Sequence, residues 1–160
     1  MVPKTEIKFS FIYNKNLNQN IILKEFLELK KKSYPFKELV AKYIDEILRL
    51  IAFYNEPWKK EYIPIYIIFG KVKSFSDPLT LKYQEDNKLL LFILIHELIH
   101  NNLTKKYKDT KSLHKEIDKI YQKVICDLKL QDFEEAKKKY NEKYNAEGNF
   151  HHSLNGGLRE

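Results

Sequence analysis

The sequence predicts a single α+β domain, and three observations support this fold class. The chain has 160 residues, which is long enough to bury a core without disulfide bonds. Hydrophobic residues make up 43% of the chain and aromatic residues 14%, which excludes a disordered protein. Short β-branched and aromatic runs stand between longer segments of helical period. We expect one domain over residues 1–145, followed by a tail over residues 146–160 that has little periodicity and three of the four glycines.

The first third of the chain contains one predicted strand and two predicted helices. Alternation predicts a strand over residues 6–13, with one side formed by Ile7, Phe9, Phe11 and Tyr13. After an asparagine-rich turn, an amphipathic pattern predicts a short helix over residues 20–31. Pro35 stands near the first turn of a longer predicted helix over residues 36–54. Pro57 follows closely and marks the end of that helix.

Two further strands are predicted in the middle of the chain. The run YIPIYIIF is β-branched and aromatic, and it predicts a buried strand over residues 62–69. Its proline, Pro64, indicates that this part of the strand lies at a sheet edge or at the strand's start. Residues 79–84 alternate between apolar and polar, which is typical of a half-buried strand.

Three helices are predicted in the remainder. The first covers residues 88–103, with Asp86 or Asn87 as its N-cap. A polar, lysine-rich connection separates it from a second helix over residues 113–130. The third begins at about residue 133, where Asp132 followed by Glu135 is similar to a capping box.

Composition and charge limit the cellular context and the partners. The N-terminus has no apolar signal sequence, and the longest apolar run, residues 89–95, is too short to span a bilayer. The single cysteine, Cys126, fits a reducing compartment. We therefore expect a cytoplasmic protein without a membrane partner. The net charge of +7 allows a nucleic-acid partner, but the lysines are scattered, which favours an ordinary solvated surface.

The segment His-Glu-Leu-Ile-His at residues 96–100 predicts a metal site. On a helix, His96 and His100 lie one turn apart on the same face, so both imidazoles can bind one cation. Glu97 lies beside them, close enough to act on a metal-bound water. This is the HExxH arrangement, in which two histidines bind zinc and the glutamate is the general base. The sequence thus predicts a catalytic zinc site at the end of an otherwise apolar helix.

The third zinc ligand is either His114 or Glu116, both on the following predicted helix. Around that helix, His114 lies about 60° from the centre of the apolar stripe and Glu116 about 100° away on the opposite flank. The histidine is better directed towards the core, but both residues stay candidates. His151 and His152, in the tail, are weaker ones.

The motif HELIH, followed after thirteen residues by HKEIDKIY, makes the chain similar to zincin metallopeptidases, and in particular to the SprT-like group. That likeness implies a small mixed sheet, a backing helix, the HExxH helix and a following ligand helix. It also implies His96, His100 and His114 as zinc ligands and Glu97 as the catalytic base. The chain departs from the SprT-like pattern at Lys115, where glycine is usual. A second resemblance is to compact, minigluzincin-like peptidases, in which Glu116 would be the third ligand.

The resemblance further implies that the strand before the active-site helix is a sheet edge that pairs with extended substrate. The substrate-binding residues would then be Leu79, Thr80, Leu81, Lys82 and Tyr83.

Three tyrosines are candidate oxyanion stabilisers, although a packing role is favoured for each: Tyr83, Tyr107 and Tyr121. The histidines of the tail could also block the metal's open position. Two residues after the HExxH motif, where a hydrophobic residue often stands, this chain has Asn102.

The function expected from these observations is zinc-dependent hydrolysis of peptide bonds, with a peptide or protein as substrate. Two alternatives stay open. One is a binding module that has the zincin fold without catalysis. The other is a nucleic-acid-associated protease of the SprT-like kind, which would bind DNA in a salt-sensitive manner.

Overall fold

A computed structural model describes residues 2–11, 19–69, 75–76, 78–130 and 133–147 of the chain. Within these residues the fold is a mixture of helices and one mixed sheet, which confirms the predicted α+β class. Three strands run parallel to one another, and a short fourth strand is antiparallel. The order across the sheet is β1 (Lys4–Phe11), β2 (Tyr62–Phe69), β4 (Leu79–Lys82) and β3 (Phe75–Ser76).

The central strand β2 has the predicted bounds, and its two faces differ. Alternate residues are buried against the helices, namely Ile63, Ile65, Ile67 and Phe69. Pro64 pairs with Glu6 of β1, whereas β4 pairs with β2 only from Tyr66 onwards. Proline is tolerated here because the β4 side of the sheet does not extend to the start of β2. Pro64 therefore lies near the start of the strand, where β2 is paired with β1 alone, in agreement with the prediction.

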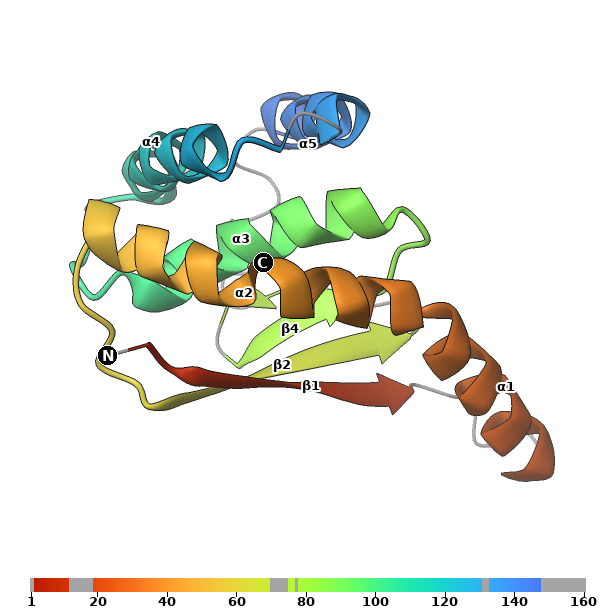
Figure 1. The fold of residues 1–160 in the computed structure, drawn as a ribbon. Helices are drawn as coiled ribbons and strands as arrows, with labels where there is room; N and C mark the ends of the chain where they lie inside the picture. The colour runs from red at the N-terminus through yellow and green to blue at the C-terminus, as the bar shows by residue number, and fades with distance from the viewer. Residues whose placement is uncertain (1, 12–18, 70–74, 77, 131–132, 148–160) are drawn as a thin grey trace.

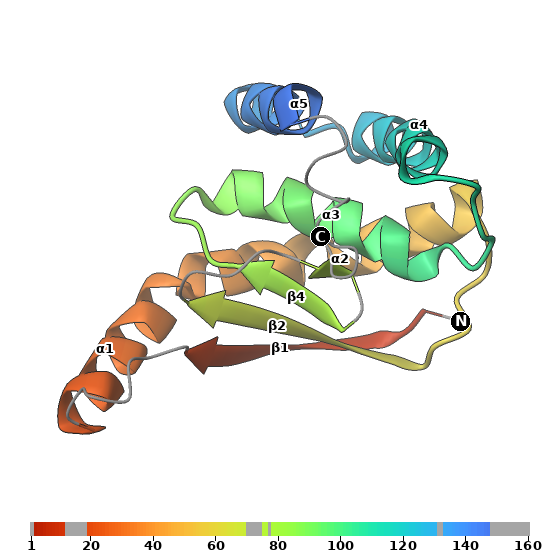
Figure 2. The same cartoon turned by 180° about the vertical axis from the view of Figure 1, so that it is seen from behind.

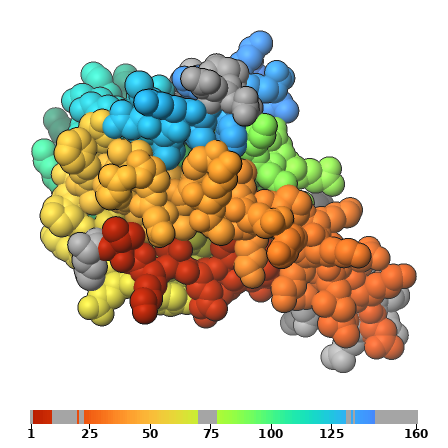
Figure 3. Space-filling model, in the orientation of Figure 1, coloured from red at the N-terminus to blue at the C-terminus, as the bar shows by residue number. Residues whose placement is uncertain are grey.

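The helices form two layers over one face of the sheet. In Figures 1 and 2, α2 and α3 lie directly over the sheet, and α4 and α5 lie over α3 on its far side. Figure 3 shows α1 projecting from the body of the molecule, where Leu23 and Leu27 are exposed. The bounds are α1 (Gln19–Lys32), α2 (Tyr34–Tyr54), α3 (Asn87–Asn102), α4 (Thr110–Leu128) and α5 (Glu134–Glu147). None of these helices combines the length and apolarity that a bilayer crossing needs.

Helix α3 is the centre of the fold, and its position explains its composition. It contacts β3 and β4 on one side and α2, α4 and α5 on the others. A helix surrounded in this way must be apolar around its whole circumference. Every residue from Leu89 to Ile99 is buried, including the polar His96 and Glu97. The predicted N-cap is confirmed at Asp86, whose side chain accepts a hydrogen bond from the Leu89 amide at 3.1 Å.

The strand predicted over residues 79–84 is shorter than expected, and its predicted position at the sheet edge is wrong. The strand β4 ends at Lys82 and lies between β2 and β3. The edge is β3, which pairs antiparallel with Leu79 and Thr80. The chain just before β4 thus folds back along it and takes the place that the prediction left for a substrate. Leu79, Thr80 and Leu81 are all buried, because α3 and the neighbouring strands enclose them.

Helix α4 begins three residues earlier than predicted. Asp109 is its N-cap, with a carboxylate that accepts a hydrogen bond from the Ser112 amide at 2.7 Å. The same bond lowers the pKa of Asp109. Three predictions fall wholly or partly outside the described residues: the end of the first strand at Tyr13, the cap at Asp132 and the tail. Helix α5 continues to Glu147, past the expected domain end at residue 145.

Candidate metal centre

The histidines of the HELIH segment lie in the last two turns of α3. His96 and His100 share a face with Phe92, four residues earlier, as helical geometry requires. Their ring centroids are 4.9 Å apart. This face is turned away from the sheet, because Phe92 and His96 contact side chains of α4 and α5. The side chains of this face therefore meet the second layer of helices and not the strands.

Helix α4 adds a third imidazole to this pair. The ring of His114 lies 5.5 Å from that of His96 and 5.2 Å from that of His100, centroid to centroid. One nitrogen from each of the three rings lies within 4.8 Å of the others. His114 stands in the second turn of α4, on the flank of the buried stripe that includes Ile117 and Tyr121. The return of the chain after α3 thus brings the three rings into one cluster.

The alternative third ligand, Glu116, does not belong to this cluster. Its carboxylate lies 3.8 Å from the ammonium of Lys119, one turn further along α4, in a half-exposed position. It stands two positions after His114, about 200° further around the helix, so it points to a different side. His151 and His152 are outside the described residues. Of the candidate ligands, the structure brings His96, His100 and His114 together and leaves Glu116 apart.

Nε2 of each of the three histidines is buried, and His96 is the most deeply buried of the three residues. His96 is only 3% exposed, whereas His100 and His114 are half-buried. Glu97, the next residue after His96, is 2% exposed. An ionised carboxyl group at this depth is costly unless a positive charge lies close by. A cation held by the histidines would supply that charge.

Burial also prepares His114 to bind a cation. It lowers the pKa of this imidazole from 6.5 to about 4. The ring is therefore neutral at physiological pH, and a neutral imidazole has the lone pair that a metal ligand needs.

One close neighbour of the cluster was not predicted from the sequence. The hydroxyl of Tyr140, on α5, lies 2.8 Å from Nδ1 of His96, in a hydrogen bond that is buried. Tyr140 follows His96 by more than forty residues and belongs to no motif, and the chain has eleven tyrosines. The weak signal was its spacing of seven residues from Phe133, which places both on one stripe of the last helix.

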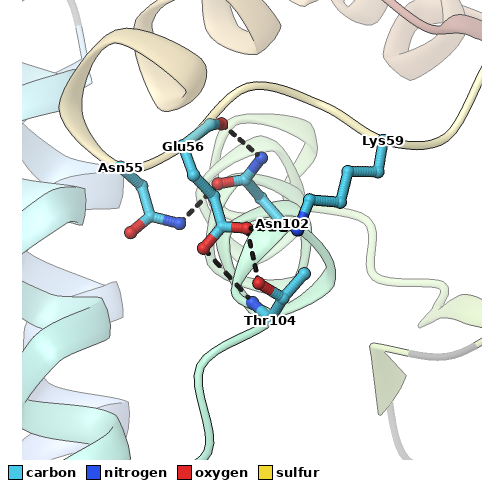
Figure 4. Close-up of polar contacts among 5 residues, drawn as sticks. All are labelled: Asn55, Glu56, Lys59, Asn102 and Thr104. Carbon is cyan, nitrogen blue, oxygen red and sulfur yellow. Dashed lines mark hydrogen bonds and ion pairs between the residues drawn. The ribbon is translucent and has the colours of Figure 1, made fainter.

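A network of hydrogen bonds holds the end of α3 just after His100 (Figure 4). The Asn102 side chain is 3% exposed; it accepts from the Asn55 amide at 2.6 Å and donates to the Glu56 carbonyl at 3.0 Å. The hydroxyl of Thr104 donates to the Glu56 carboxylate at 2.6 Å and lowers the pKa of that group. Lys59 lies 3.7 Å from the same carboxylate. The network gives the Asn102 amide a structural role: it joins the ends of α2 and α3.

The other predicted site residues are spread more widely. Tyr83 follows β4, beside the start of α3, whereas His100 lies about 20 Å further along the helix axis from Asn87. Lys82, like Tyr83, lies near the start of α3 and far from His100. Tyr121 is fully buried, stacked on Tyr140 with 4.3 Å between ring centroids, so it cannot contact a substrate in an open cleft.

Tyr107 and the start of β4 lie nearer to the histidine end of α3. Tyr107 is in the connection between α3 and α4, half-buried, with the ammonium of Lys105 over its ring. Burial raises the pKa of its hydroxyl, which therefore stays protonated at neutral pH. Leu79 and Thr80, at the start of β4, have buried side chains.

Comparisons with known proteins add no relative. No family model, no curated protein and no solved structure matches this chain.

Proposed function

We propose that this protein is a zinc-dependent peptidase of the zincin type, with His96, His100 and His114 as the metal ligands. The observation that carries the proposal is the convergence of one nitrogen from each of these three imidazoles within 4.8 Å, next to a buried glutamate. A pair of histidines at HExxH spacing is a sequence pattern, but a third histidine from another helix at the same point is a tertiary arrangement.

The donor set suits zinc. Three imidazoles match the ligands of catalytic zinc sites, which keep a fourth position open. At a zinc–nitrogen distance of about 2.1 Å, tetrahedral ligands lie about 3.4 Å apart. The separation of at most 4.8 Å needs only a small side-chain adjustment to reach that value. When bound there, zinc supplies a Lewis acid that lowers the pKa of a water molecule and polarises a carbonyl group.

Glu97 has the role of general base in this proposal. It adjoins His96 on α3, and its carboxylate would accept a proton from the water as the oxygen attacks the peptide carbonyl carbon. The same carboxyl group would then give the proton to the amide nitrogen as the carbon–nitrogen bond breaks. The net reaction adds one water molecule across the peptide bond, and Glu97 returns to its ionised form.

The proposed position of the peptide follows from the corrected sheet order. Of the two outer strands, β3 contacts α3, whereas β1 lies at the opposite edge of the sheet. An extended peptide that adds to the sheet near the histidines would therefore lie along the β3 side. Leu79 and Thr80 would then lie behind β3, which pairs with them, and Lys82 and Tyr83 lie near the start of α3, too far from the histidines to contact the scissile bond.

The test compares the zinc-loaded wild type with Glu97→Gln on a library of unstructured peptides. We expect hydrolysis by the wild type, and a loss of at least about 100-fold in Glu97→Gln while zinc stays bound. Equal activity in both proteins would contradict the role of Glu97. A zinc-loaded wild type without hydrolysis, or one that binds no zinc, would contradict the peptidase itself.

A further inference from the structure

We propose that Tyr140 is a positioning residue for His96: its hydroxyl oxygen accepts a hydrogen bond from Nδ1–H and thereby keeps the Nε2 lone pair directed into the three-histidine cluster. This inference rests on the proposed zinc site. It adds a residue from α5 to a site that is otherwise made by α3 and α4.

The contact itself is short and shielded from water. The Tyr140 hydroxyl lies 2.8 Å from Nδ1 of His96, and both residues are 3% exposed. Nε2 of His96 is buried as well. Only one of the two ring nitrogens can carry the proton in a neutral imidazole, and the partner of one nitrogen decides the state of the other. A fixed oxygen at Nδ1 therefore determines whether Nε2 can bind a cation.

Tyr140 is held in place by aromatic packing on several sides. Its ring is stacked on Tyr121, with 4.3 Å between centroids and 17° between planes. Phe92, one turn before His96, contacts both tyrosine rings and Phe133. These rings come from α3, α4 and α5, so the hydroxyl cannot move without disturbing three helices.

A second contact fixes α5 along α3. The ammonium of Lys139, next to Tyr140, donates to the N-cap carboxylate Asp86 at 3.1 Å. Lys139 is half-exposed, so this ion pair contributes little to stability, but it is a further contact between α5 and the start of α3.

The consequence for the metal is a preorganised ligand. Histidine ligands in metal sites usually donate their other N–H to a fixed acceptor, and loss of that acceptor weakens metal binding about 10- to 100-fold. As whole residues, His100 and His114 are half-buried, whereas His96 is enclosed. Among the three ligands, His96 is therefore the one whose orientation the second layer of helices imposes.

The chain offers a matched control in Tyr121. It is stacked on Tyr140, it is fully buried, and its hydroxyl has no hydrogen-bond partner among the residues that the structure describes. Tyr121→Phe and Tyr140→Phe each remove one buried hydroxyl from the same aromatic stack. Only Tyr140→Phe removes a contact with a proposed ligand.

The experiment measures the zinc dissociation constant of the wild type, Tyr140→Phe and Tyr121→Phe by competition with a chromophoric chelator. We expect the constant to rise about 10- to 100-fold in Tyr140→Phe and to change less than about twofold in Tyr121→Phe. Thermal unfolding of the metal-free proteins shows whether both variants keep the fold. Nitrogen NMR of the zinc-loaded wild type is expected to show a proton on Nδ1 of His96.

The outcomes separate this inference from the proposed function. A wild type that binds zinc, with an unchanged constant in Tyr140→Phe, would overturn the role of Tyr140 and leave the zinc site intact. A zinc-loaded wild type in which Nδ1 of His96 carries no proton would do the same, even if Tyr140→Phe did not fold. A wild type that binds no zinc would overturn the site and this inference together.

Discussion

The imidazole rings of His96 and His114 lie 5.5 Å apart, although they belong to different helices and the intervening chain leaves α3 and turns back into α4. Two features make this distance short. The hydrogen bonds of Asn102 fix where α3 ends, and the Asp109 cap fixes where α4 begins. The position of His114 relative to His96 thus depends on both ends of the connection between α3 and α4.

The identity of the third ligand gives the first prediction. His114→Ala should weaken zinc binding by at least about 100-fold, because a site with two imidazoles lacks the third nitrogen of catalytic zinc centres. Glu116→Ala should leave the affinity unchanged, since the Glu116 carboxylate pairs with Lys119 on the surface of α4. Metal analysis and chelator competition on both variants test this. Zinc loss in Glu116→Ala with retention in His114→Ala would reverse the assignment.

The second prediction concerns the pH dependence of stability in the metal-free protein. Burial lowers the pKa of His114 from 6.5 to about 4, so the unfolded chain binds a proton in that interval and the folded chain does not. The free energy of unfolding should therefore fall as the pH is lowered from 6.5 towards 4. Above pH 6.5, His114 is neutral in both states and adds no pH dependence.

Urea unfolding at several pH values, with His114→Leu as the comparison, checks this prediction. The variant should lose stability less steeply than the wild type over the same interval, because it lacks the titrating ring. Parallel curves for the two proteins would show that burial of His114 does not shift its pKa.

The third prediction concerns the network at the end of α3. Asn102→Ala leaves the Asn55 amide and the Glu56 carbonyl without the partner they have now, which should lower the free energy of unfolding by about 1–3 kcal/mol. Zinc affinity should fall as well, because His100 lies in the same turn. The control is Asn101→Ala, whose hydrogen bond with Lys60 is exposed and should matter by less than about 0.5 kcal/mol. If Asn102→Ala and Asn101→Ala lowered the free energy of unfolding equally in urea, Asn102 would have no special role.

The fourth prediction compares two phenylalanines. Phe92 is fully buried among the aromatic rings of α4 and α5, whereas Phe53 is 77% exposed. Phe92→Ala should cost about 3–5 kcal/mol, since it leaves a cavity beneath His96. Phe53→Ala should change stability by no more than about 0.5 kcal/mol. Chemical denaturation measures both; a small effect at Phe92 would mean that the second layer of helices packs loosely on α3.

Most elements of the fold could be predicted from local patterns. The strand over residues 62–69, the cap at Asp86 and the class of the domain are confirmed, because alternation, capping and burial all leave marks in the sequence. The position of β4 within the sheet was predicted wrongly: it was expected at the edge, and it lies between β2 and β3. Strand order depends on which segment pairs with which, and a two-residue strand such as β3 has no periodicity to detect.

The sequence by itself determined the spacing within α3: any helix over this segment places His96 and His100 on one face, with Glu97 beside them. It also determined that α3 would be buried, because a segment so uniformly apolar must be enclosed. Only the tertiary structure decided that His114, and not Glu116, faces this pair, since that depends on how α4 is rotated against α3. It alone brought Tyr140 to Nδ1 of His96, because a contact between distant helices depends on packing and on no local pattern.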